Sequence, residues 1–261
     1  MPIKTFSITL CCLLALVLTG AAQAHNLWLN PDNHYPAVGE TVTIAIGWGH
    51  KYGADRSDES VRADRVAEIW ALDPDGRTIA LAPEEGPAFK LKVDKAGVYQ
   101  VAARIKPGVF TTTPQGRKWA DKKGVENPIK CTAFKIEAQT IVVAGDGDRN
   151  PQAGTGLPLE LVPLANPARL TAGSELSVRV LFRGQPLAGM PVRAVFAGYA
   201  ETAPKEKPFA VEAVTDDKGE ATLVLDRAAY WLIHLSHTIA HPEPDRCDDD
   251  RYNTAFTLQV R

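Results

Sequence analysis

Histidines are the residues of this 261-residue chain best suited to metal chemistry, and they are unevenly placed. All six lie beyond residue 24, near the beginning or the end of the remaining chain, at His25, His34, His50, His234, His237 and His241. Neutral imidazole is the commonest metal-ligating side chain in proteins. If folding brings the two ends of the chain together, several of these histidines could share one metal ion.

His25 stands directly after a typical signal-peptidase site. Lys4, the apolar run of residues 6–20 and the small-x-small sequence Ala22-Gln23-Ala24 predict that residues 1–24 are a cleaved signal peptide. The apolar run of roughly 15 residues is shorter than the approximately 20 needed to span a bilayer. We therefore expect a periplasmic protein without membrane insertion after cleavage.

The same cleavage would create a metal-binding group. Cutting after Ala24 leaves an α-amine on His25, and this amine and Nδ1 of the ring can chelate one ion together. Cutting after Ala22 is the alternative, and it leaves Gln23-Ala24-His25, which resembles the amino-terminal copper- and nickel-binding motif. Both cuts predict a terminus able to bind a metal.

His50 ends the sequence Gly47-Trp48-Gly49-His50, which follows a predicted strand over residues 41–46. Glycines on both sides of a tryptophan allow the backbone to bend at the end of the strand. The pattern therefore predicts that a loop presents His50. Asp55 lies close by in sequence and could orient the imidazole through its second nitrogen.

The third ligand is expected in "YWLIHLSHTIAHPEPD", residues 230–245. In a strand alternate side chains share a face, so His237 lies on the side of the apolar residues at 231, 233 and 235, and His234 lies on the other side. A strand-end residue on the packed side borders other elements, which favours His237. The expected nitrogen set of His25, His50 and His237 suits copper or nickel. The secondary candidates are His241, His34 and Asp55.

The elements that must position these residues are short β-rich runs separated by Gly, Pro, Asp and Asn. They predict an all-β fold of two tandem immunoglobulin-like β-sandwiches, at residues 25–143 and 157–261, joined by a linker at 144–156. A single large barrel is the alternative. The predicted strands are 41–46, 66–72, 98–103, 130–143, 175–182, 192–197, 230–237 and 253–260, and the polar segment 115–128 is expected to be a long loop or a short helix.

Charge and cysteine content limit the possible partners. Removing the leader takes away one lysine and no acid, which changes the net charge from −2 to −3, so nucleic acid is not expected as a partner. Beyond the leader, Cys131 and Cys247 form an even pair, which in an exported chain suggests one disulfide. Their expected positions in different domains leave the alternative that the two cysteines never meet.

Several motifs together resemble a broad family of bacterial exported proteins of unknown function. They are "AHNLWLNP" after the signal, "GWGHKY" at a strand end, the segment "GLPLELVPLANPARLTAGSELSVRVLFRGQPLAGMPV" and "TDDKGEATLVL" before a Trp-containing strand. Many members are described as periplasmic components of cobalt/nickel uptake systems, which implies an inner-membrane metal transporter as partner. The second half also resembles a transthyretin-like or peptidase-regulatory sandwich.

The resemblance implies roles for particular positions. The histidine after the signal corresponds to His25, the Gly-His pair to Gly49-His50, and the late strand-end histidine to His237. Asn26 and Asn30 stand where relatives commonly carry acids, which implies weaker affinity or a changed metal.

Three functions follow as hypotheses. The first is a divalent-metal-binding accessory of metal uptake, and the second is a non-catalytic binding or structural module. The third is a copper oxidase with a histidine brace, for which Trp28, Trp48 and Trp119 could form an aromatic surface. The sequence lacks a nucleophile elbow, a phosphate loop, a paired-cysteine motif and a His-Glu-x-x-His helix, so we do not expect an enzyme.

Overall fold

The computed structural model describes residues 25–145 and 154–261. The predicted signal peptide, and most of the predicted linker at 144–156, lie outside these residues. The described chain is all-β, as the sequence predicts, and its strands form three sheets. The helical elements are one short α-helix and two 3-10 turns: α1 (Tyr199–Thr202), η1 (Ala63–Arg65) and η2 (Pro167–Arg169).

The first sheet carries the amino-terminal strands in the order β1-β2-β6-β5. Its strands are β1 (Asn26–Pro31), β2 (Thr41–Gly49), β6 (Ala88–Lys92) and β5 (Ala82–Pro83). Along β2, Val42, Ile44 and Ile46 are buried and the residues between them are accessible, which is the period of a strand packed on one face. Strand β1 instead buries Leu27, Trp28 and Leu29 in succession.

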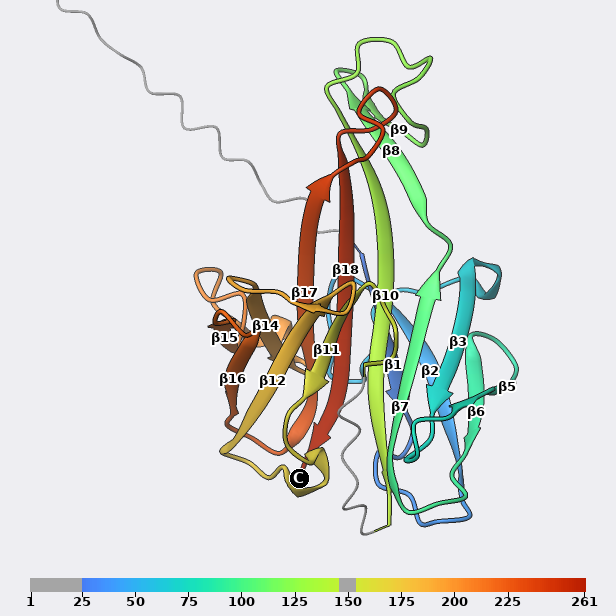
Figure 1. Ribbon diagram of the computed structural model, residues 1–261, viewed down its shortest axis with the longest axis vertical. Coiled ribbons are helices and arrows are strands. Elements are labelled where there is room, and N and C mark those ends of the chain that lie inside the picture. The colour runs from blue at the N-terminus through green and yellow to red at the C-terminus, as the bar shows by residue number, and fades with distance from the viewer. Residues whose placement is uncertain (1–24, 146–153) are drawn as a thin grey trace, which may run out of the picture.

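The central sheet has ten strands and runs through both halves of the chain, in the order β15-β14-β17-β18-β10-β7-β3-β4, with β8 and β9 added beside β10. Its strands are β3 (Val66–Leu72), β4 (Thr78–Ile79), β7 (Gly97–Ile105), β8 (Gly108–Thr113), β9 (Gly116–Lys118), β10 (Lys130–Ala144), β14 (Pro191–Phe196), β15 (Val211–Val214), β17 (Ala229–Ala240) and β18 (Asp249–Val260). The long strands β10, β17 and β18 extend past the smaller sheets towards the end where β8 and β9 lie (Figure 1).

The third sheet belongs to the second half. It contains β11 (Leu159–Pro163), β12 (Ser174–Phe182), β13 (Gln185–Pro186) and β16 (Glu220–Leu225). Strand β12 pairs with all three of the others.

The two larger hydrophobic cores of the described residues lie on opposite faces of the central sheet. Along β10, Val142 belongs to the core beneath the first sheet, whereas Ile141 and Val143 belong to the core beneath the third sheet. Successive side chains of a strand point to opposite faces, so β10 serves both cores at once.

This arrangement differs from the two predicted sandwiches, each of which would have two sheets made only of its own strands. Strand β10 of the first half pairs in parallel with β18 of the second half, from Thr132 opposite Asp249 to Thr140 opposite Thr257. The two expected halves therefore share one sheet. Alternation along each strand predicts buried faces, but it does not reveal which strand becomes a neighbour across the chain.

All eight predicted strands are present, and several are longer than expected. Strand β3 covers the predicted residues 66–72, while β17 continues past residue 237 to Ala240. The segment 115–128 is largely loop, as expected, although it includes the short strand β9.

Cys131 and Cys247 form a disulfide with an S–S distance of 2.09 Å, which resolves the alternatives left by their spacing. The bond ties the start of β10 to the turn before β18, so it spans the two halves of the chain. In the part of the chain that the structure describes, no helix has the length and apolar character required to cross a bilayer.

Candidate metal site

His25 and His50 are neighbours because β1 and β2 form one antiparallel ladder. The outermost register pair is Asn26 with Gly49, and the two histidines are the next residues at that end. Residues opposite each other in such a ladder lie side by side. The centroids of the two imidazoles are 4.0 Å apart.

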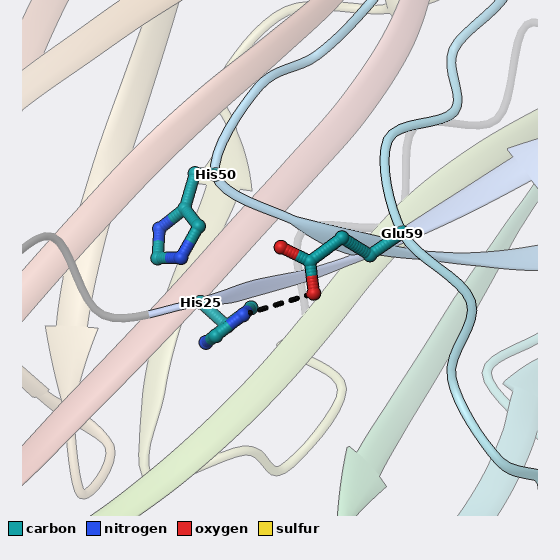
Figure 2. Close-up of side chains that lie close together, drawn as sticks. All are labelled: His25, His50 and Glu59. Atoms are coloured by element: carbon teal, nitrogen blue, oxygen red, sulfur yellow. Dashed lines mark hydrogen bonds and ion pairs between the residues drawn. The ribbon is translucent and has the colours of Figure 1, made fainter.

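Glu59 completes a group of three potential metal ligands, as Figure 2 shows. Its Oε2 lies 3.1 Å from Nε2 of His25. One potential ligand atom from each of the three residues falls within 4.8 Å of the other two. All three side chains are accessible, with exposed fractions of 38% for His25 and 49% for Glu59, and His50 is exposed.

A backbone bridge places Glu59 beside the two histidines. Glu59 pairs with Trp48 of β2 in an isolated antiparallel bridge, in which its N–H donates to the Trp48 carbonyl at 2.8 Å. Sequence reasoning missed Glu59. It is one of several acids between residues 55 and 59, and nothing in their spacing identifies the one that returns to the strand.

The two glycines of Gly47-Trp48-Gly49-His50 are required by close approaches. A Cβ on Gly47 would lie 1.9 Å from Nε1 of Trp28. Gly49 has a φ of +142°, and a Cβ there would lie 2.3 Å from the Asp58 carboxylate. The glycines therefore let β2 pack against β1 and let the loop fold back over its own strand end.

Asp58 fixes the backbone at His50. Its Oδ2 accepts hydrogen bonds from the N–H of His50 at 2.7 Å and from that of Lys51 at 2.9 Å. These two hydrogen bonds lower the pKa of the Asp58 carboxyl, and the bond from the N–H of Lys51 makes the larger contribution. The carboxylate therefore stays charged and keeps the loop closed at neutral pH.

Asp55, which the sequence suggested as a partner of His50, interacts within its own turn. Its carboxylate accepts hydrogen bonds from the hydroxyl and the N–H of Ser57, and the hydroxyl bond is the main cause of its lowered pKa. Asp58, and not Asp55, is therefore the acid that contacts His50, and it contacts the backbone N–H of His50 and not the imidazole ring.

The tryptophans near the site have separate roles. The Trp48 ring stacks on His25, with ring centroids 5.0 Å apart and an angle of 6° between the planes. Trp28 is 1% exposed, and its Nε1 donates to the Arg56 carbonyl, so it cannot contribute to a surface. Trp119 is 70% exposed and packs edge-on against Phe110.

The structure does not bring His237 to the other two predicted ligands. His237 contacts Phe182 of the third sheet, with ring centroids 4.7 Å apart, and burial lowers its pKa. Alternation along β17 puts it on the same side as Ile233 and Leu235, which face the second core. The predicted alternation was right, but the first sheet packs on the other face, so the choice of face was wrong.

The secondary histidines have structural partners. His34 is 2% exposed, and its Nδ1–H donates to the Ile141 carbonyl at 2.8 Å, while burial lowers its pKa to about 4. His241 accepts a hydrogen bond from the N–H of Glu243 through Nδ1. Neither belongs to the group around His25.

His234 lies on the face of β17 that looks towards His25. It lines the same groove as His25 and His50, a broad hollow of about 1210 Å³ over the central sheet. Burial lowers the pKa of His234 to about 4, with a smaller contribution from the Arg193 charge. His234 therefore stays neutral, but it is not one of the three clustered ligands.

The fold and the site together define an all-β protein with a surface-accessible group of two imidazoles and one carboxylate at a strand end. The chain belongs to a family described as "Domain of unknown function (DUF4198)", whose model matches residues 22–239. The match includes all three clustered residues. No curated protein matches the chain significantly.

Solved structures resemble the chain only distantly. The D0-D1 domain of intimin is 13% identical, with 89% of this chain and 99% of that chain covered and a TM-score of 0.23. Fibronectin(III)-like modules of CbhA from Clostridium thermocellum are 10% identical, with 89% and 94% covered and a TM-score of 0.22. Alpha-2-macroglobulin from Escherichia coli is 13% identical, with 89% and 15% covered and a TM-score of 0.20. TM-scores this low define neither fold nor function for this chain.

Proposed function

We propose that this protein binds a divalent transition metal, nickel, cobalt or copper, in the periplasm and acts as an accessory to metal uptake, with an inner-membrane transporter as its partner. The observation that carries the proposal is the convergence of His25, His50 and Glu59 at one strand end. Imidazole and carboxylate donors suit divalent ions of this series.

The contact between His25 and Glu59 suggests how the ligands divide their tasks. When Nε2 of His25 carries the proton, it donates to Oε2 of Glu59 at 3.1 Å, and Nδ1 keeps its lone pair for a metal. Nδ1 is also the nitrogen that can chelate together with the α-amine released by signal cleavage. In this arrangement His25 and His50 hold the ion, and Glu59 orients His25.

Glu59 also compensates for the absence of an acid at Asn26 and Asn30, near the start of the chain. Relatives commonly have acids at the positions of Asn26 and Asn30, which suggested that support for the metal was missing. Glu59 supplies a carboxylate beside His25 from another segment of the chain. The proposed site therefore keeps one acidic group.

The solvent exposure of the proposed ligands and the presence of a disulfide both support a periplasmic metal-binding role. A site with exposed ligands can take up and release an ion without opening the fold. The Cys131–Cys247 bond is typical of proteins in oxidising compartments such as the periplasm.

Calorimetric titration of the chain beginning at His25 with Ni(II), Co(II) and Cu(II) tests the proposal. We expect one ion of at least one of these metals to bind per chain. Indifference to all three would refute metal binding. Peroxide production by the copper-loaded protein with a reductant would instead indicate the oxidase hypothesis.

A further inference from the structure

The groove beside His25 has a strongly biased lining. The described residues that line it include six lysines and arginines and no aspartate or glutamate, although the whole chain carries 31 acids and 29 bases. Such a concentration of one charge in a hollow raises the local potential and attracts counter-ions of the opposite sign.

Four of these basic residues are free of ion pairs within the described ranges, and one of the four, Arg117, lies with its guanidinium carbon 4.3 Å from the centroid of the Phe110 ring. Lys130 pairs with Asp249, and Arg193 pairs with Glu212. In contrast Lys51, Lys205 and Arg251 make no ion pair with any carboxylate in the described ranges.

The charged groups of Lys51, Lys205 and Arg251 come from three separate elements around the groove. Lys51 follows β2, Lys205 lies in the segment after α1, and Arg251 belongs to β18. A ligand that meets all of them needs negative charges at more than one point. A hollow of about 1210 Å³ also exceeds what a single inorganic anion would fill.

The floor of the groove offers an unused hydrogen-bond donor. Asn253 is 2% exposed, lines the groove, and its Nδ2 has no hydrogen-bond partner. Leaving a buried donor without a partner is unfavourable, and an acceptor on a ligand would offset that cost.

Hydroxyl groups continue this polar floor. Ser236 lies opposite Asn253 across the β17–β18 ladder, and Thr238 lies opposite Arg251. Thr132 of β10 lines the same groove. Rows of hydroxyls beside an amide and a guanidinium favour a ligand that carries its own hydroxyl groups.

We propose that this groove binds a small organic polyanion with a hydroxylated skeleton. Its carboxylate or phosphate groups pair with Lys51, Lys205 and Arg251, and its skeleton accepts a hydrogen bond from Asn253. Arginine favours both kinds of anion because its planar fork matches their oxygens. The inference rests on the groove and not on the proposed metal site.

Calorimetric titration of metal-free protein at low ionic strength, with citrate in one arm and fructose 1,6-bisphosphate in the other, tests the inference. We expect at least one of the two to bind once per chain, and which one binds identifies the anionic group. Binding should weaken as salt is added, because charge pairs are screened.

Variants distinguish a built site from general attraction. Arg251→Gln should weaken binding by about tenfold or more, because it removes a charge-assisted contact. A surface double variant, Lys51→Gln with Lys205→Gln, should do the same even if Arg251→Gln impairs folding. Lys218→Gln is the matched control, since Lys218 is exposed in the β15–β16 turn and does not line the groove.

Two outcomes would overturn the inference: neither anion binds, or Lys218→Gln weakens binding as much as the groove variants do. Glu59→Leu separates this inference from the proposed function, because Glu59 belongs to the group of potential metal ligands but does not line the groove. It should weaken binding of the metal alone by about 10- to 100-fold and should not weaken anion binding to the metal-free protein.

Discussion

His25 lies beside His50, with ring centroids 4.0 Å apart, because the two residues extend the same antiparallel ladder by one step. This pairing depends on backbone hydrogen bonds along β1 and β2 and not on contacts between the rings. The two imidazoles are therefore held in place before any ion arrives, which lowers the ordering cost of binding.

The first prediction compares His50 and His237, which the sequence predicts as ligands of the same metal ion. His50→Ala should weaken the binding of nickel or copper by at least about tenfold, because it removes one of the clustered ligands. His237→Ala should leave the affinity unchanged, since His237 contacts Phe182 on the other face of β17. Calorimetry on both variants checks this, and equal losses would contradict the site described here.

The second prediction concerns the task of Glu59. If Glu59 orients His25, Glu59→Gln keeps an acceptor for the Nε2 proton and should weaken metal binding by less than about tenfold. Glu59→Leu removes the acceptor and should cost about 10- to 100-fold. Affinities of the two variants measured side by side decide the point. Equal, large losses would show that Glu59 is itself a metal ligand.

The third prediction concerns the amino terminus. Protein that begins at His25 should bind Cu(II) more tightly than protein in which residues 20–24 are retained before His25, because only the former has an α-amine next to the ring, and the retained residues keep His25 out of the third position of the amino-terminal copper- and nickel-binding motif. We expect a difference of about tenfold or more, since one ligand atom is lost. Intact mass of the secreted protein establishes which terminus exists, and equal affinities would exclude the amine as a ligand.

The fourth prediction tests the glycine before His50. Gly49→Ala should lower the free energy of unfolding by about 1–3 kcal/mol and also weaken metal binding, because its Cβ would collide with Asp58. Gly76→Ala is the control. It has a φ of +78° but nothing within 4 Å of the added Cβ, so it should lose about 1 kcal/mol from backbone strain and keep its metal affinity. Thermal unfolding and calorimetry of both variants give the comparison.

The fifth prediction concerns pH. Burial raises the pKa of Glu137 from 4.5 to about 7. The folded protein therefore holds this proton more tightly than the unfolded chain, so the unfolding free energy should fall as pH rises from about 4.5 to about 7, by up to about 3 kcal/mol. Glu137→Gln should remove this dependence and stabilise the protein at pH 8 more than at pH 5. Denaturant unfolding at both pH values measures it, and an unchanged slope would assign the effect to another group.

Sequence patterns predicted the local structure well because strand formation depends on short-range alternation. The run from Tyr230 to His237 forms the middle of β17, and its apolar residues Trp231, Ile233 and Leu235 are buried at alternate positions as predicted, although Leu232 on the other face is buried as well. The Gly47-Trp48-Gly49 pattern likewise indicated a bend that presents His50. Such features depend on residues within a few positions of each other.

Which strands become neighbours depends on contacts between distant parts of the chain, and no local pattern contains that information. The parallel pairing of β10 with β18 joins residues more than a hundred positions apart. The same pairing decides which face of β17 lies towards His25. It therefore explains why His234, and not His237, lines the groove.

The sequence by itself determined the all-β class, the approximate strands, and the candidacy of His25 and His50, because these follow from alternation and from residue chemistry. Only the tertiary structure decided that Glu59 joins them, that Cys131 meets Cys247, and that the two halves share one sheet. The physical reason is that burying two apolar faces of one sheet fixes its strand order, and the strand order places the side chains.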